Sequence, residues 1–293
     1  MTGEGSAVAA GARGPAGARG RARIGTAGLP AGHPAAQPRA RNRGRARTRL
    51  SVALASMLAV AALSLPAVAP ATYETTASIR GATGLGWYSS NWAGYAVERG
   101  PYRSVSGQWA VPRVAPTSRS TFSALWVGID GVTNTSLIQA GTEQDFYGGA
   151  AHYSAWWEVL PAPAVRIRSL AVRPGDRMTA RIERVGTDRW RITISDARGG
   201  SYTTVRAYAG PGTSAEWIEE APVVGWRTAA LATHGSTAFD NATVNGTDPR
   251  LIAADGGAMI RGDLLVEVPS KPDRDGNGFT LSQQGTAPAP PVS

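Results

Sequence analysis

The sequence predicts an all-β fold, with its strands arranged as a sandwich or a barrel. From Trp87 onward, short apolar runs alternate with polar residues and are separated by Gly and Pro. No apolar stripe with i, i+3, i+4, i+7 spacing is long enough to indicate a helix. All nine tryptophans fall between residues 87 and 226, which indicates a single domain over that window. Many even strands without intervening helices are typical of sandwiches and barrels.

The clearest element is a hairpin over residues 177–195. In RMTARIERV, 177–185, the apolar Met178, Ala180 and Ile182 share one face, and RWRITIS, 189–195, alternates in the same way. The intervening GTD is a turn signal, so the hairpin is expected to keep one face in water. Further strands are expected at 90–97, 104–111, 122–129, 135–141, 151–159, 164–172, 202–209, 214–220, 236–244 and 263–268.

The segment before this domain has the layout of a secretory leader. Residues 39–49 are rich in arginine, residues 50–65 are apolar and uncharged, and PAVAPA, 66–71, offers small-residue cleavage sites. We interpret 39–71 as a signal peptide and the protein as secreted, without stable membrane association after cleavage. An uncleaved anchor is the alternative, although the apolar run is shorter than the ~20 residues that span a bilayer. Residues 1–38 are expected to be a disordered extension, 72–86 a linker or short propeptide, 87–284 the domain and 285–293 a disordered tail.

The charge balance argues against nucleic acid as a partner. The whole chain has a formal net charge of +9, but residues 1–50 hold ten of its 30 basic residues and one of its 21 acids. Because residues 51–71 are uncharged, the remainder carries 30 − 10 = 20 basic and 21 − 1 = 20 acidic residues. The mature chain therefore has no net charge with which to steer a polyanion.

The residue types that are missing exclude several kinds of catalysis. The chain has no cysteine, and only His152 and His234 follow the leader. There is no thiol nucleophile, no G-x-S-x-G elbow and no H-E-x-x-H motif, so we expect neither a metal nor another cofactor. Hydrolysis would then need a carboxylate as the base and an Asn or Gln amide as the donor to an oxyanion.

Strand alternation brings acids and amides onto the same faces as tryptophans, since side chains two residues apart share a face. Trp126 shares a face with Asp130 in SALWVGIDG, and Trp156 with Glu158 in YSAWWEVLP. Gln139 falls on the face of Leu137, Gly141 and Glu143 in SLIQAGTEQDFY. These strands predict one shared concave groove that is shaped by tryptophans and populated by acids.

The stretch AEWIEEAP, 215–222, contains three glutamates, which alternation separates. Glu216 and Glu220 share a face, whereas Glu219 points with Trp217 to the other. Glu216 and Glu220 are ~13 Å apart along the strand, too far for the paired carboxyls of a glycosidase. Glu158 or Asp130 could still partner one of them, so a β-sandwich glycosidase remains an alternative.

Five motifs in order resemble the glutamic peptidases, or eqolisins: SSNWAGYAV (89–97), ALWVGIDG (124–131), LIQAG (137–141), YSAWWEVLP (153–161) and AEWIEEAP (215–222). The resemblance runs from about Trp87 to Phe279. It implies a concanavalin A-like sandwich of two antiparallel sheets and a secreted, monomeric endopeptidase that acts on proteins or peptides. The family carries an apolar residue where this chain has Glu219, and its familiar fungal members are acidic.

The resemblance also implies roles for individual residues. The catalytic pair falls on Gln139 and Glu220, with Glu220 as the base and acid for a water and Gln139 as the oxyanion donor. The residues that line the substrate cleft of the family fall on Trp92, Trp126, Asp130, Trp156 and Glu158. A non-catalytic module that binds carbohydrate or peptide on the same sandwich is the alternative function.

One further motif resembles a calcium-binding loop. PDRDGNGF, 272–279, places oxygen-bearing side chains at Asp273, Asp275 and Asn277, followed by Gly278. The position of the bidentate glutamate is Gln284, and no helix is expected on either side. We therefore interpret this stretch as a glycine-rich hairpin turn.

Overall fold

The computed structural model describes residues 84–283 and 285–292. The expected extension 1–38, the signal peptide 39–71 and residues 72–83 of the linker lie outside the described residues. The described part contains seventeen β-strands and, as its one helical element, the 3-10 turn η1, Ala253–Asp255. No helix in that part is long and apolar enough to cross a membrane. The prediction of an all-β fold is confirmed.

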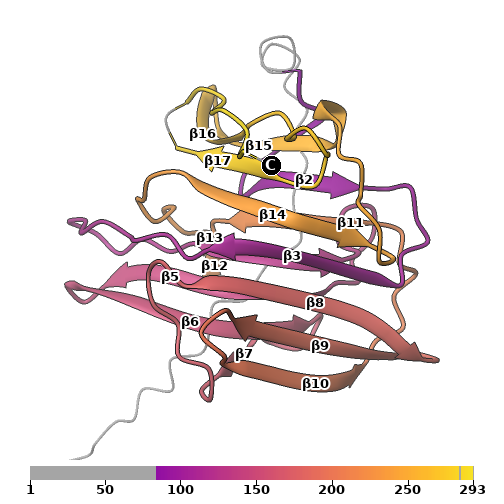
Figure 1. Ribbon diagram of the computed structural model, residues 1–293. Coiled ribbons are helices and arrows are strands. Elements are labelled where there is room, and N and C mark those ends of the chain that lie inside the picture. The colour runs from indigo at the N-terminus through magenta and orange to yellow at the C-terminus, as the bar shows by residue number, and fades with distance from the viewer. Residues whose placement is uncertain (1–83, 284, 293) are drawn as a thin grey trace, which may run out of the picture. The chain divides into compact units, whose positions relative to one another are not determined.

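The strands form two layers, which are visible one in front of the other in Figure 1. The first layer has the strand order β10-β9-β8-β3-β14-β17, and all its pairings are antiparallel. Its strands are β3 (Ser104–Ala110), β8 (Arg177–Gly186), β9 (Arg189–Asp196), β10 (Ser201–Ala207), β14 (Thr237–Val244) and β17 (Phe279–Ser282).

The second layer has the order β15-β2-β11-β4-β5-β6-β7, and these strands also pair antiparallel. Its strands are β2 (Trp92–Val97), β4 (Ala124–Ile129), β5 (Ile138–Tyr147), β6 (Ala150–Val159), β7 (Val165–Ile167), β11 (Ala215–Glu220) and β15 (Gly256–Arg261). The short β1 (Trp87–Ser89) adds a parallel pairing to β15. β16 (Leu264–Pro269) pairs with β15 and β17 and so joins the two layers.

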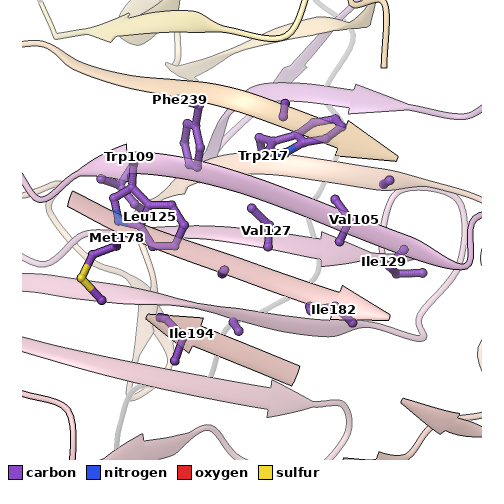
Figure 2. Packing of buried hydrophobic residues seen from close by; sticks show 14 of the residues in the cluster. Val105, Trp109, Leu125, Val127, Ile129, Met178, Ile182, Ile194, Trp217 and Phe239 are labelled. Atoms are coloured by element: carbon purple, nitrogen blue, oxygen red, sulfur yellow. The ribbon is translucent and has the colours of Figure 1, made fainter. Parts of the chain in front are cut away.

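The main core lies between the layers (Figure 2), and nearly every strand contributes the apolar side chains of one of its faces to it. Trp217 of β11 is completely buried there, and its indole Nε1 donates to the Ser106 carbonyl of β3 at 2.8 Å. A Cβ at Gly107 would come within 2.6 Å of that indole, so the glycine makes room for the ring. Replacing Trp217 by alanine is expected to cost about 3–5 kcal/mol of stability.

The predicted hairpin is confirmed, because β8 and β9 pair antiparallel from Met178–Asp196 to Gly186–Arg189. Met178, Ala180 and Ile182 are completely buried, as the alternation predicted. The strand expected at 164–172 is shorter and ends at Ile167. Five elements have no counterpart in the expected strands: β1, β15, β17, and the two-residue strands β12 (Val223–Val224) and β13 (Arg227–Thr228). Several of these are short or rich in glycine, and such segments carry little strand signal.

Candidate active site

The candidate site starts from β11, which lies between β2 and β4. Glu220 is paired with Trp92 of β2 and with Ala124 of β4. Because side chains alternate along a strand, Glu216, Ile218 and Glu220 face away from the core while Trp217 faces into it. The packing agrees, since Trp217 belongs to the main core and Ile218 to a second apolar cluster.

Three tryptophans from three strands build that second cluster on the outer face of the layer. Trp92, Trp126 and Trp156 are buried there with Ala124, Leu137 and Ile218. The rings of Trp92 and Trp126 meet edge to face, with centroids 4.9 Å apart and an interplanar angle of 76°. The three predicted cleft tryptophans are thus brought together on the face that carries Glu220.

Gln139 and Glu158 meet on the neighbouring strands β5 and β6, where they are direct cross-strand partners. The Gln139 Nε2 donates to Glu158 Oε2 at 2.7 Å, and both side chains are completely buried. The Oε1 atoms of Gln139 and Glu158 have no hydrogen-bond partner among the described residues. The pair is therefore joined by one hydrogen bond, and its two Oε1 atoms can still accept hydrogen bonds from a ligand or water.

The Glu220 carboxyl is held by neutral donors. Asn91 Nδ2 donates to Oε1 at 3.2 Å and Trp126 Nε1 to Oε2 at 3.1 Å. Burial raises the pKa of Glu220 well above its ordinary value, and these donors and the nearby Trp92 indole oppose the shift only in part. The Trp92 Nε1 itself does not reach good hydrogen-bond geometry. Asn91 was missed in the sequence, although it stands in the SNW motif.

Glu158 connects the two halves of the site. Its charge further raises the pKa of Glu220, while its own carboxyl receives the Gln139 amide. Burial raises the pKa of Glu158 to about 7, although the hydrogen bond from Gln139 opposes the rise. The site therefore holds two carboxyls that exchange protons at a higher pH than exposed glutamates.

Glu216 lies on the same face, in one cross-strand row with Gly128, Gln139 and Glu158. Gly128 has no side chain to fill the row, and a Cβ there would come within 2.7 Å of the Trp126 ring and 3.3 Å of Glu216 Oε2. Both carboxyl oxygens of Glu216 are buried without a hydrogen-bond partner among the described residues. Burial, and then the charge of Asp130, raises its pKa well above the ordinary value.

Asp130 sits at the end of β4 with a positive φ of 69° and is completely buried. Its carboxylate accepts from the Tyr208 hydroxyl at 2.6 Å, from the Gly212 and Thr213 amides at 2.9 and 2.8 Å, from the Thr213 hydroxyl at 3.1 Å and from Asn134 at 3.0 Å. Asp130 thus anchors the segment that leads into β11. Its predicted role in lining a substrate cleft stays a prediction.

A cavity of about 380 Å³ adjoins the tryptophan cluster. Two of its walls, Trp87 and Val132, also pack against that cluster. Ala96, another wall, shares the face of Trp92 on β2. Glu98, Arg99 and Asp255 supply charged groups to its lining. Within residues 84–283 and 285–292, no group of three or more His, Cys, Asp or Glu side chains is arranged to hold a metal ion.

A family model described as the Peptidase A4 family matches residues 90–263. Aspergillopepsin-2 of Aspergillus niger is 29% identical over 181 residues, which cover 53% of this chain and 64% of that protein. The match therefore spans less than two thirds of the length of that relative.

Two solved structures share the fold. The crystal structure of scytalido-glutamic peptidase with a transition state analog inhibitor has a TM-score of 0.57 at 22% identity. The structure of SCP-B, a member of the Eqolisin family of peptidases, in complex with the tripeptide Ala-Ile-His, has a TM-score of 0.52 at 20% identity. Each covers 66% of this chain and 98% of the other chain.

The five motifs that suggested the glutamic peptidases lie on β2, β4, β5, β6 and β11, the strands that surround the tryptophan cluster. The family model begins within the first of these motifs and extends beyond the last. Since it covers more than half of the 293 residues, this chain belongs to the Peptidase A4 family, the glutamic peptidases or eqolisins.

Proposed function

We propose that the chain is a secreted, monomeric endopeptidase that hydrolyses peptide bonds of protein or peptide substrates with Gln139 and Glu220. The observation that carries the proposal is that the hydrogen-bonded pair Gln139 and Glu158 shares one tryptophan-lined face with Glu220 in a Peptidase A4 chain. Two of the similar solved structures, one with a transition state analog inhibitor and one with a tripeptide, support peptides as the substrate class.

In the proposed reaction, Glu220 acts first as the base. It takes a proton from a water molecule whose oxygen attacks the carbonyl carbon of the scissile bond. When the carbon–nitrogen bond of the tetrahedral intermediate breaks, Glu220 returns the proton to the leaving amine. A raised pKa favours the first step, because a carboxyl that binds its proton more tightly is a stronger base.

Gln139 supplies the neutral donor. One N–H of its amide donates to Glu158, and the other, which has no partner in the described part of the chain, can donate to the oxygen that becomes negative in the intermediate. Its unpartnered Oε1 can accept a hydrogen bond from the attacking water. Glu158 positions the amide, because its Oε2 accepts the hydrogen bond from Nε2 and so selects the orientation with Nε2 toward it.

The test is hydrolysis of a denatured protein across pH 3–8. We expect the wild-type chain to cleave it, and to do so in the presence of serine-, cysteine- and metallo-peptidase inhibitors. Glu220→Gln is expected to lose about 10²–10⁴ of the rate and Gln139→Ala about 10²–10³.

Glu183→Gln and Gln108→Ala, on strands of the other layer, are the matched controls and should keep wild-type rates. Wild-type rates in both site variants would contradict the proposal. Binding of peptide or oligosaccharide without turnover at any pH would instead support the non-catalytic module. Release of reducing sugar that is lost with Glu158 or Asp130 would support the glycosidase.

A further inference from the structure

The loop between β16 and β17 contains the motif Asp-x-Asp-x-Asn-Gly at residues 273–278. The flanking strands pair antiparallel through Val268–Ser282 and Pro269–Leu281, so the hairpin interpretation of this stretch is confirmed. Gly276 has a φ of 72°, which supplies the sharp reversal inside the loop. Asp273, Asp275 and Asn277 thus stand at every second position of one tight turn.

The turn uses only part of the oxygen atoms that these side chains offer. Asp273 Oδ1 accepts from the backbone amides of Asn277 and Gly278, both at 3.0 Å. The other oxygen, Oδ2, is buried and has no hydrogen-bond partner in the described residues. It would lie 2.3 Å from a Cβ at position 278, so only glycine leaves space for it.

Asn277 also has a buried side-chain oxygen, Oδ1, without a hydrogen-bond partner among the described residues. Asp273 and Asn277 expose only 8% and 9% of their surface, so solvent reaches these atoms poorly. A buried oxygen that lacks a donor costs roughly 1–3 kcal/mol, and two in one turn indicate a ligand that both oxygens bind.

Asp275 adds a second carboxyl to this place. It stands two residues from Asp273 in the same tight turn, and the two side chains interact directly. Neither carboxyl forms an ion pair within the described residues, although Arg274 lies between them in sequence. Two ionised carboxyls in one turn repel each other. A cation bound between them would attract both and so make the electrostatic interaction at this place favourable.

We propose that residues 273–278 form a calcium-binding site, with Asp273 Oδ2, the Asp275 carboxylate and Asn277 Oδ1 as ligands. All three donors are oxygen atoms, which hard cations prefer, and no imidazole or thiol is present to favour zinc. Three side chains on a short turn leave other positions of the shell to water. Ca²⁺ tolerates such an irregular shell better than Mg²⁺, which demands near-ideal octahedral geometry.

The loop is tied to a neighbouring segment. The Gly276 carbonyl accepts from the Leu251 amide at 2.9 Å, and the Asn277 carbonyl from the Ala242 amide at 3.0 Å. An ion that holds the loop would therefore also stabilise the end of β14 and the segment that follows it. Gln284, at the position of the bidentate glutamate, argued against calcium in the sequence, but the proposed ligands lie in 273–278 and do not require it.

The experiment measures Ca²⁺ binding and thermal unfolding of the whole secreted chain. Calorimetric titration with CaCl₂ should give one site with a Kd of about 10⁻⁴–10⁻³ M, the range of extracellular modules. In 10 mM Ca²⁺ the Tm should rise by about 3–10 °C over the value in EDTA. The same concentration of Mg²⁺ should raise it less.

Asp275→Ala tests the ligand set, since Asp275 is exposed and its removal leaves the Asp273 turn intact. The variant should fold, keep the wild-type Tm in EDTA within a few degrees, and lose the Ca²⁺-dependent rise. Asp263→Ala, which removes an exposed acid from the turn between β15 and β16, is the matched control and should keep the full rise. Absence of binding at 10 mM Ca²⁺, or an equal rise in Asp275→Ala and wild type, would overturn the site.

Discussion

Glu219 and Glu220 are neighbours on β11, yet their carboxyls lie on opposite faces of the strand and have different kinds of partner. Glu219 faces a histidine: its Oε1 lies 2.5 Å from His234 Nε2, and both side chains are completely buried. Glu220 accepts from two neutral donors, Asn91 and Trp126, and forms no ion pair within residues 84–283 and 285–292. A buried acid with a cationic partner is a structural group, whereas one with neutral donors remains free to take and return a proton.

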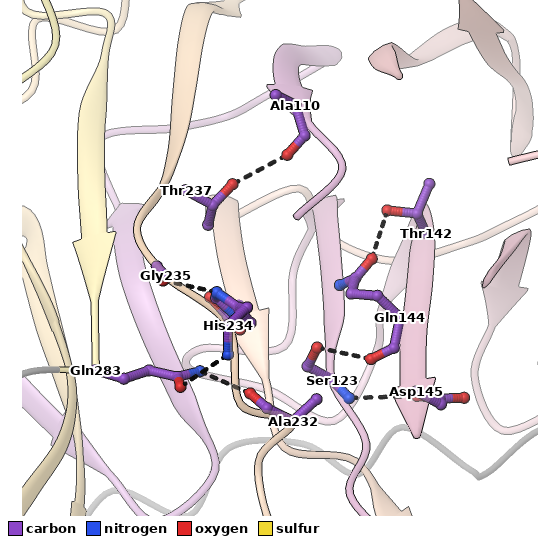
Figure 3. Close-up of polar contacts among 11 residues, drawn as sticks. Ala110, Ser123, Thr142, Gln144, Asp145, Ala232, His234, Gly235, Thr237 and Gln283 are labelled. Carbon is purple, nitrogen blue, oxygen red and sulfur yellow. Dashed lines mark hydrogen bonds and ion pairs between the residues drawn. The ribbon is translucent and has the colours of Figure 1, made fainter. Parts of the chain in front are cut away.

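The surroundings of His234 reinforce the difference. Gln283 accepts from the His234 backbone amide at 3.3 Å and donates to the Ala232 carbonyl at 2.8 Å (Figure 3). Burial by itself lowers the pKa of His234, but the charge and hydrogen bond of Glu219 outweigh it and the pKa is raised. Glu267, which is buried nearby, has its pKa raised well above the ordinary value by burial and then by Glu219. The ion pair of Glu219 with His234 and the carboxyl of Glu267, which keeps its proton to a higher pH, thus lie on this side of β11.

The largest expected effect separates the two glutamates by activity. Glu220→Gln should lower kcat/KM by about 10²–10⁴, because the base is lost, whereas Glu219→Gln should stay within a few-fold per folded molecule. Steady-state kinetics on samples normalised by near-UV circular dichroism would measure both. Equal losses in the two variants would remove the functional distinction between the faces.

The next effect concerns stability on the Glu219 face. His234→Leu leaves a buried carboxylate without its partner and should cost about 3–5 kcal/mol in the free energy of unfolding. The double variant Glu219→Leu/His234→Leu removes both charges and should recover most of that loss. Urea unfolding of the three proteins measures the difference. A double variant as unstable as the single one would show that packing, and not charge, dominates here.

The pH dependence of stability tests the Glu220 face. Glu158 has its folded-state pKa raised from 4.5 to about 7, so its contribution is complete below pH 4.5 and declines as the pH rises through 7. At about 1.4 kcal/mol per pKa unit, the decline amounts to roughly 3 kcal/mol. The raised pKa of His234 acts in the same direction, because its stabilisation is also lost with rising pH.

Glu158→Gln separates these two contributions. It should reduce the slope of the profile between pH 4.5 and 7, while the decline from His234 and from the other buried carboxyls with a raised pKa, such as Glu143 and Glu220, remains. Urea unfolding at intervals across pH 4–8 would measure both curves. A slope between pH 4.5 and 7 that is unchanged in the variant would assign the decline to other carboxyls.

The smallest expected effect removes one donor from Glu220. Trp126→Phe keeps most of the ring packing but deletes the N–H that contacts Oε2. Losing a hydrogen bond to a charged group costs about 1.5 kcal/mol, or roughly tenfold in kcat/KM, and raises the pKa of Glu220 further. The acid limb of the pH–rate profile should therefore move to higher pH. A limb that stays in place would show that Trp126 does not act on this carboxyl.

Strand alternation predicted much of the site without any structure. It separated Glu219 from Glu220 and Glu216, and the packing of Trp217 and Ile218 on opposite faces agrees. It also associated Trp126 and Trp156 with acids or amides, because the two-residue period is a local property of extended backbone. Strand alternation did not predict β15 and β17, because these strands are short or rich in glycine and few of their side chains alternate.

What depends on partners distant in sequence was decided by the tertiary structure. The pairing of Glu219 with His234, the donation from Asn91 to Glu220 and the five donors around Asp130 all join different elements. The unpartnered oxygens of residues 273–278 likewise appear only once burial is known. The sequence by itself determined which face each side chain takes, because neighbouring residues set that locally. Which carboxyls are compensated depends on burial and on donors from other strands, and only the folded chain brings these together.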